Sequence, residues 1–173
     1  MLQKHIISNL SMHYYRYPLE FFLKAQKELC FSQISFYGSV PHLWADHFEV
    51  ENNNVVDLFQ SYGFNVDEFF SRPYNYTLYE QKDSLLGKYS MNYYFKLIDF
   101  LSENRFSKLG VDLWGAVRNK EKQIQFDTCV FNTKKLCQYA AEKGIDILVG
   151  NISYQNSALM NTLSDVRSLL ECV

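Results

Sequence analysis

The stretch Leu136–Val149, LCQYAAEKGIDILV, decides the fold of this chain. Its first half ends a helical pattern in which small or apolar residues recur at three- and four-residue intervals. These residues are Phe126, Val130, Thr133, Cys137 and Ala140. Gly144 then supplies the glycine that commonly follows the last helical turn. Ile145–Val149 is an almost continuous apolar run, typical of a strand buried on both faces of a parallel sheet.

The same alternation of strand and helix extends outward over the whole chain. Strands are expected upstream over residues 5–12, Gln33–Tyr37, Val66–Phe70 and Lys108–Trp114. Helices are expected from Pro18, from a cap at Asn54 to Gly63, from a cap at Asp83 or Ser84, and near Thr162–Cys172. Five strand–helix units predict an α/β fold, with a parallel sheet and right-handed crossovers, in one domain spanning residues 1–173.

Each predicted helix has an apolar face that should point toward the sheet. In the helix that begins at Pro18, this face holds Phe22, Ala25 and Leu29. In the helix after Ser84, it holds Leu86, Tyr89, Tyr93, Leu97 and Leu101. In the last helix, it holds Leu163, Val166 and Leu170.

Charge and hydropathy exclude several classes of protein. The net charge of −2 provides no field to attract nucleic acid. The sequence contains no run of about 18 apolar residues, so no membrane span is expected. Residues 1–15 lack the apolar core and cleavage site of a secretion signal. The four cysteines form no CxxC pair, which favours reduced thiols in a cytoplasmic protein.

Three segments resemble the xylose isomerase-like family of sugar phosphate isomerases and epimerases, in particular fructoselysine 3-epimerase-like proteins. Ile34–His42 (ISFYGSVPH) is similar to the family's second strand, and Arg72–Asn75 (RPYN) to the loop before its third helix. Leu136–Val149 resembles the fourth helix running into the fifth strand. The resemblance implies a (β/α)8 TIM barrel, a fold of ~250 residues. With five units, this chain is expected to be a partial, C-terminally truncated barrel.

The resemblance also implies metal-dependent chemistry, in which Mn²⁺ or Mg²⁺ stabilises an enediolate while two glutamates move a proton. The glutamate that ends the family's fifth strand aligns with Gly150, and the proline after it with Asn151. The other ligands belong to strands six to eight. Asp112 has a side chain that can point into the barrel, whereas Asp146 lies at the far end of its strand. We therefore expect no catalytic residue, metal site or cofactor within this chain.

Six residues fall at or just beyond the carboxyl ends of the first four predicted strands, where barrel enzymes bind their substrates. These candidate substrate-binding residues are His13, Tyr37, His42, Tyr74, Asn75 and Trp114. Imidazole, phenol and amide groups suit hydroxyl recognition, and an indole can stack on a sugar face. The alternative is that Tyr37 and Trp114 pack in the core and that both histidines are solvated loop residues.

Three functional hypotheses follow from the resemblance. The chain is a divergent, inactive isomerase or epimerase that keeps a cleft for a sugar or sugar phosphate. Alternatively, it is an active metal-dependent ketose epimerase or isomerase completed by another chain, or a structural scaffold for interactions. Because five parallel strands cannot close a barrel, open sheet edges are expected. We therefore expect a homo-oligomer or a complementing chain as partner, and neither nucleic acid nor membrane.

Overall fold

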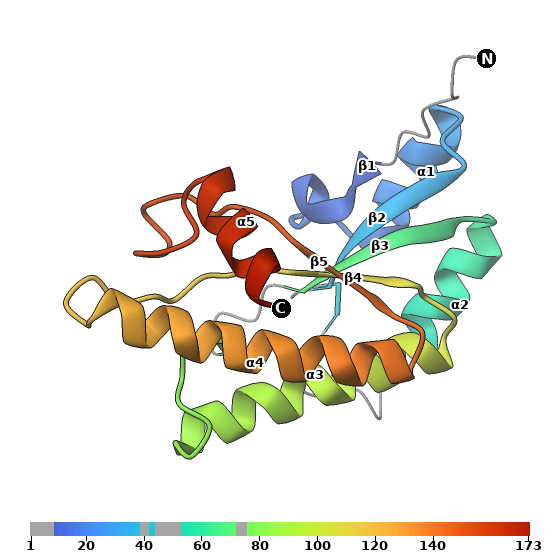
Figure 1. Ribbon diagram of the computed structural model, residues 1–173. Coiled ribbons are helices and arrows are strands. Elements are labelled where there is room, and N and C mark those ends of the chain that lie inside the picture. Colours follow the sequence, from blue (N-terminus) through green and yellow to red (C-terminus); the bar gives the residue numbers. More distant parts are fainter. Residues whose placement is uncertain (1–8, 39–41, 44–52, 72–75) are drawn as a thin grey trace, which may run out of the picture.

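The computed structural model describes residues 9–38, 42–43, 53–71 and 76–173 (Figure 1). The five strands of its one sheet are β1 (Asn9–Leu10), β2 (Gln33–Gly38), β3 (Asn65–Ser71), β4 (Lys108–Val111) and β5 (Asp146–Val149). The strands lie in sequence order and every neighbouring pair is parallel. The predicted α/β fold with five strand–helix units is thus confirmed.

A helix follows each strand. A short 3-10 helix, Ser11–Tyr14, comes between β1 and the first long helix. The α-helices are α1 (Leu19–Glu28), α2 (Asn53–Tyr62), α3 (Leu85–Glu103), α4 (Lys122–Glu142) and α5 (Leu163–Cys172). The helices α3 and α4 contact one another and lie side by side against the sheet (Figure 1). Within the part of the chain that the structure describes, every helix is too short or too polar to cross a membrane.

The helix termini are fixed by local chemistry. Of the two predicted caps of α3, Ser84 is the one used, and its hydroxyl accepts a hydrogen bond from Gly87 N at 2.9 Å. After α2 and α4, Gly63 and Gly144 have φ angles of +74° and +72°. This left-handed conformation suits glycine because it lacks a Cβ. At α5, Thr162 forms a capping box with Asp165.

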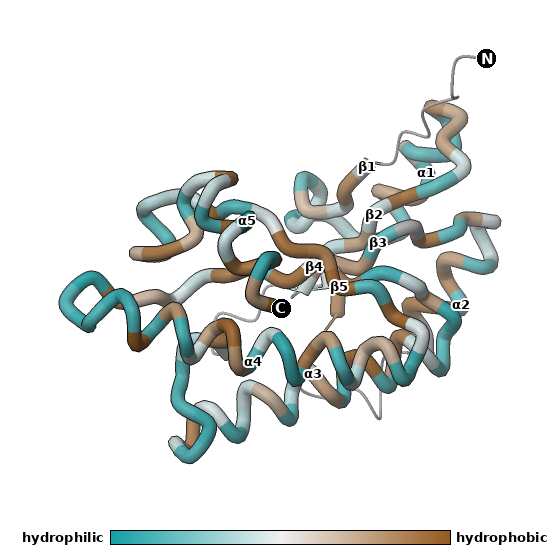
Figure 2. Tube along the Cα trace, in the orientation of Figure 1, coloured by the Kyte–Doolittle hydropathy of each residue, from teal (hydrophilic) through white to brown (hydrophobic). Residues whose placement is uncertain are grey.

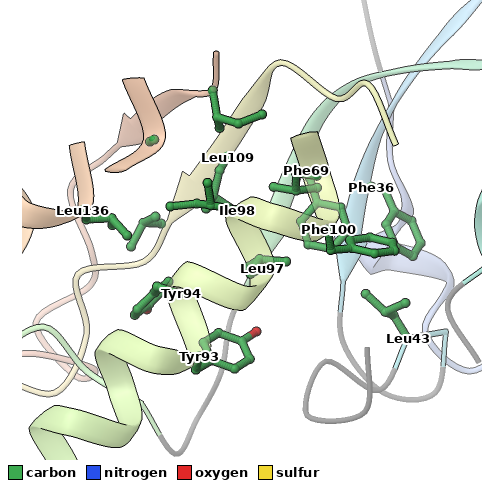
Figure 3. Close-up of a cluster of buried hydrophobic side chains, with 14 of the residues drawn as sticks. Phe36, Leu43, Phe69, Tyr93, Tyr94, Leu97, Ile98, Phe100, Leu109 and Leu136 are labelled. Atoms are coloured by element: carbon green, nitrogen blue, oxygen red, sulfur yellow. The ribbon is translucent and has the colours of Figure 1, made fainter. Parts of the chain in front are cut away.

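The strand register separates the two faces of the sheet. Phe36, Phe69, Leu109 and Ile147 pair across β2 to β5 and form one row. This row faces the helices, because Phe36 contacts Phe59 of α2 and Phe69 contacts Phe100 of α3. Figure 3 shows Phe36, Phe69 and Leu109 of this row gathered with side chains of α3. Alternation along the strands places Tyr37, Phe70, Gly110 and Leu148 in a row on the opposite face.

Two predicted strands are too long. The expected first strand covers residues 5–12, but Ser11 and Met12 already belong to the 3-10 helix. The expected fourth strand, Lys108–Trp114, ends at Val111, so Asp112 and Trp114 lie in the loop after it. Both segments are apolar enough to continue a strand, yet they leave the sheet because the chain turns there to begin the next helix.

The predicted apolar faces of α1 and α3 are wrong at one end. Leu29 is 63% exposed because it follows the last residue of α1. Leu86 and Tyr89 are exposed in the first two turns of α3, which extend beyond the sheet, whereas Tyr93 and Leu97 farther along the helix are buried. In α4 the buried face also differs from the prediction and contains Gln125, Cys129, Asn132, Thr133, Leu136 and Ala140.

The fifth unit is less buried than predicted. Ile147, Leu148 and Val149 of β5 are all half-buried, although their apolar run predicts a strand covered on both faces. The reason is that β5 is an edge strand, paired only with β4. In α5, Val166 and Leu169 face the core, whereas Leu163 and Leu170 are 76% and 58% exposed. Figure 2 shows apolar colour concentrated along the strands, with more polar colour on the surrounding helices.

Candidate binding site at the carboxyl ends of the strands

The candidate site is the edge of the sheet at which all five strands end. Because the strands are parallel, Leu10, Gly38, Ser71, Val111 and Val149 finish on the same side, and each leads into the loop before a helix. In α/β proteins, loops at this edge carry most binding and catalytic groups. The described parts of these loops make three groups of contacts.

The first group joins the ends of β1 and β2. The hydroxyl of Ser11, which is fully buried, accepts a hydrogen bond from Tyr37 N at 2.9 Å. The side chain of Tyr37 is half-buried on the sheet face opposite the helix-facing row. His13 is exposed on the 3-10 helix after β1. Both predicted residues therefore lie at this edge, with Tyr37 in the sheet and His13 in solvent.

His42 lines a hollow beside this first group of contacts. Its Nε2 lies 2.7 Å from the backbone oxygen of Tyr17. Because that oxygen can only accept, Nε2 is the donor of this hydrogen bond. The hollow measures about 660 Å³, and Arg16 and Glu20 also line it. It offers a cation, a carboxylate and an imidazole to a polar ligand.

The second group joins the loops after β3 and β4. The Thr77 hydroxyl donates to Trp114 O at 2.9 Å, and the Tyr79 hydroxyl donates to Leu113 O at 3.2 Å. These bonds fix the backbone on both sides of the Trp114 indole, which is half-buried and packs against the core. Thr77 and Tyr79 could not be predicted from the sequence, because their partners are backbone oxygens 37 and 34 residues away.

The third group joins the loops after β4 and β5. Ala158 N donates to Ala116 O at 2.9 Å, and Gly115 N donates to Asn156 O at 3.2 Å. The Arg118 guanidinium donates to Tyr154 O at 2.9 Å and lies 4.4 Å from the centre of the Tyr154 ring. The loops after β3, β4 and β5 are thereby linked in series into one continuous rim.

Buried hydroxyl groups lie beneath this rim. The Tyr93 hydroxyl lies 2.6 Å from the hydroxyl of Ser71, the last residue of β3. Burial raises the pKa of Tyr94 and that of Tyr79 far above the usual tyrosine value, and burial also raises the pKa of the Cys129 thiol to about 11. All three groups therefore stay protonated at neutral pH. They can take part in hydrogen bonding but do not supply a base.

The described residues do not fit a catalytic metal ion. They contain no group of three or more His, Cys, Asp and Glu side chains arranged to hold one. Gly150, directly after β5, is exposed, and a Cβ built on it would meet no atom within 4 Å. Glu68 is half-buried, and its Oε2 accepts a hydrogen bond from the Ser35 hydroxyl at 3.3 Å. Asp112 is half-buried in the loop after β4 and belongs to no group of three or more such side chains among the described residues.

Solved structures of sugar epimerases share this arrangement at low sequence identity. D-psicose 3-epimerase from Clostridium cellulolyticum H10, solved with D-tagatose, matches with a TM-score of 0.74 and 14% identity over 96% of this chain. The structure of 3-keto-D-glucoside 4-epimerase from E. coli matches with a TM-score of 0.75 and 15% identity over 98% of this chain. The fold of this chain is therefore that of part of a TIM barrel. A xylose isomerase domain protein from Planctomyces limnophilus matches with a TM-score of 0.59 at 13% identity over 86% of this chain.

This chain spans only part of each of these barrels. It covers 60% of the D-psicose 3-epimerase chain, 65% of the 3-keto-D-glucoside 4-epimerase chain and 53% of the Planctomyces chain. The expected partial barrel of five βα units thus agrees with the structural matches. No protein-family model matches the sequence, and no curated protein matches it either.

Four of the six predicted substrate-binding residues lie within the described part of the chain. His13, Tyr37, His42 and Trp114 all lie at the strand ends or in the loops after them. Tyr74 and Asn75 lie outside the described residues. The structure brings His42 into the hollow with Arg16, which the sequence analysis did not single out. A signal for Arg16 was present, because it lies between two tyrosines in the loop after the first strand.

Proposed function

We propose that this chain is a divergent sugar or sugar phosphate isomerase/epimerase-type barrel that binds a carbohydrate without metal-dependent turnover by its own residues. The observation that carries the proposal is Gly150. It directly follows β5, where the resemblance expects a glutamate, and it has no side chain. The described residues contain no group of three or more metal-ligating side chains that could take over the role. Without a metal to stabilise an enediolate, the remaining groups bind and orient a ligand.

The residues at the strand ends suit hydroxyl recognition. The Tyr37 phenol can both donate and accept, whereas the His42 imidazole offers only Nδ1, because its Nε2 donates to Tyr17 O. Arg16 and Glu20 in the adjoining hollow add a fixed positive and a negative charge. Arg16, Glu20 and His42 line the same hollow and can bind hydroxyl groups of a sugar there. At the strand ends, an indole such as that of Trp114 offers an apolar surface for a sugar ring.

Titration calorimetry with D-fructose and D-tagatose tests this proposal. We expect saturable binding to the wild-type chain. The affinity should fall by roughly tenfold in His42→Ala and in Tyr37→Phe, since each variant removes a hydrogen bond to the ligand. Tyr89→Phe is the matched control, because Tyr89 is exposed on α3. An isomerase assay with Mn²⁺ on the same samples should show no turnover. Lack of saturable binding to either ketose would refute the proposal.

An active epimerase completed by further βα units is the second candidate. The exposed Leu163 and Leu170 of α5 and the half-buried β5 favour it, because these are the surfaces that a sixth unit covers in a closed barrel. Ketose turnover by a complex of this chain with a second polypeptide, and not by the chain alone, would support this candidate. Capture of a protein partner without any sugar binding would instead favour a scaffold.

We also propose a cytoplasmic location. Cys30, Cys129, Cys137 and Cys172 are all free thiols in the structure, which suits a reducing compartment. Fractionation of cells that express the chain tests this, and recovery in the membrane or secreted fraction would contradict it.

A further inference from the structure

A second hollow lies on the outer helical layer, between α3 and α4. It measures about 330 Å³ and is lined by Lys82, Lys88 and Lys135 together with Asn92 and Asn132. The lysines come from three places along the chain, namely the turn before α3, the first turn of α3 and the middle of α4. This hollow shares no lining residue with the hollow at His42.

The three lysines are positive charges without counterions among the described residues. The ion pairs found within the described ranges involve Lys143 and Arg167, and neither residue lines this hollow. The Nζ atoms of Lys82 and Lys135 lie 5.5 Å and 4.8 Å from the centre of the Phe131 ring, which orients both side chains around it. On a chain with a net charge of −2, three lysines gathered around one hollow favour an anionic ligand.

Asn132 provides a second and independent observation. It is 2% exposed, and its Nδ2 donates to Leu78 O at 2.8 Å and to Glu80 O at 3.0 Å. These two carbonyl acceptors fix the orientation of the amide. The other amide atom, Oδ1, is buried and has no hydrogen-bond partner among the described residues. A buried acceptor left in this way is unfavourable, and Asn132 lines the hollow, so a ligand hydroxyl that displaces the atoms covering Oδ1 and donates to it is stabilised there.

We propose that this hollow binds a small phosphomonoester that carries hydroxyl groups. The phosphate oxygens accept charge-assisted hydrogen bonds from Lys82, Lys88 and Lys135, and a ligand hydroxyl donates to Asn132 Oδ1. A volume of about 330 Å³ accommodates a small metabolite but not a polymer. The site shares no lining residue with the hollow at His42, so it is a second ligand site.

The experiment is titration calorimetry of the whole chain with glycerol 3-phosphate, inorganic phosphate and glycerol as probes. We expect glycerol 3-phosphate to bind more tightly than phosphate, and glycerol not to bind. Raising NaCl from about 50 to 500 mM should weaken binding, because salt screens exposed lysines. The variant Lys88→Gln/Lys135→Gln should weaken it at least roughly tenfold. Lys24→Gln, on exposed α1, is the matched control and should leave it unchanged.

Two results would overturn the proposal. One is the lack of saturable binding of glycerol 3-phosphate at low salt. The other is binding that Lys88→Gln/Lys135→Gln leaves unchanged, which would place the phosphate elsewhere. Circular dichroism of the double variant shows that a loss of binding is not a loss of fold, because both lysines are exposed. Ketose binding at the strand ends should be the same in this variant, so failure here is distinguishable from failure of the proposed sugar cleft.

Discussion

At the scale of single residues, Gly110 is one of the positions where the sheet depends on the lack of a side chain. It pairs with Phe70 of β3, and a Cβ on Gly110 would lie 2.3 Å from the Phe70 ring. We expect Gly110→Ala to lower the free energy of unfolding by about 1–3 kcal/mol, because the ring has to move within packed surroundings. Urea denaturation measures the change. Gly150→Ala is the control, and equal stability of both variants would contradict the expectation.

Gly150 lends itself to the reverse experiment. Because open space surrounds its Cβ position, Gly150→Glu should fold with unchanged stability. We expect no tight Mn²⁺ binding from this substitution alone, since the described residues supply no set of further ligands. Metal titration followed by calorimetry checks this. Tight binding accompanied by ketose turnover would mean that residues outside the described ranges, or a partner, complete the metal site.

At the scale of elements, the start of α5 depends on its capping box. The Thr162 hydroxyl accepts from Asp165 N at 3.2 Å, and the Asp165 carboxylate accepts from Thr162 N at 2.9 Å. Thr162→Ala should destabilise the protein by ~1 kcal/mol, as expected for the loss of an N-cap. Chemical denaturation measures this, with Ser164→Ala as the control in the same turn. Similar stability of the two variants would show that the cap contributes little.

The same capping box makes part of the stability depend on pH. Hydrogen bonds from the backbone N–H groups of Thr162 and Asn161 hold the pKa of Asp165 below its usual value. Since the folded pKa is lower than the unfolded value of about 3.9, the stabilisation is complete above that pH. It is lost as the pH falls through the folded pKa. In Asp165→Asn, the free energy of unfolding should therefore fall less steeply as the pH is lowered through this range. Chemical denaturation at a series of pH values measures this, and an unchanged pH dependence would argue against it.

At the scale of the whole molecule, the open end of the barrel is the main physical consequence of having five units. Leu163 and Leu170 are exposed on α5, next to an edge strand with unpaired backbone groups. We expect the chain to self-associate in the micromolar range, and Leu163→Lys/Leu170→Lys to shift it toward monomer without loss of stability. Sedimentation velocity measures both, with Leu85→Lys on α3 as the control. A wild-type monomer over the whole range would rule out self-association through this surface.

The sequence by itself determined the order and type of the elements. The alternation of apolar runs with helical periodicity, punctuated by Gly63 and Gly144, depends on local conformation and requires no knowledge of distant contacts. For the same reason, the start of α3 was predicted correctly at Ser84. The predicted cap Asn54 was wrong by a short distance, because α2 begins at Asn53. Gly150 was also visible in the sequence, because it falls directly after an easily recognised strand.

Only the tertiary structure decided which side chains are buried and which residues share a site. The apolar run of β5 predicts burial on both faces, yet it is half-exposed because burial depends on a neighbouring strand and not on the run itself. Similarly, Arg16 and His42 are far apart in the sequence but line the same hollow. The same holds for Lys82, Lys88 and Lys135 in the second hollow. These residues come close together because of the parallel topology and the packing of the helices. They depend on long-range geometry, which the local spacing of residues does not encode.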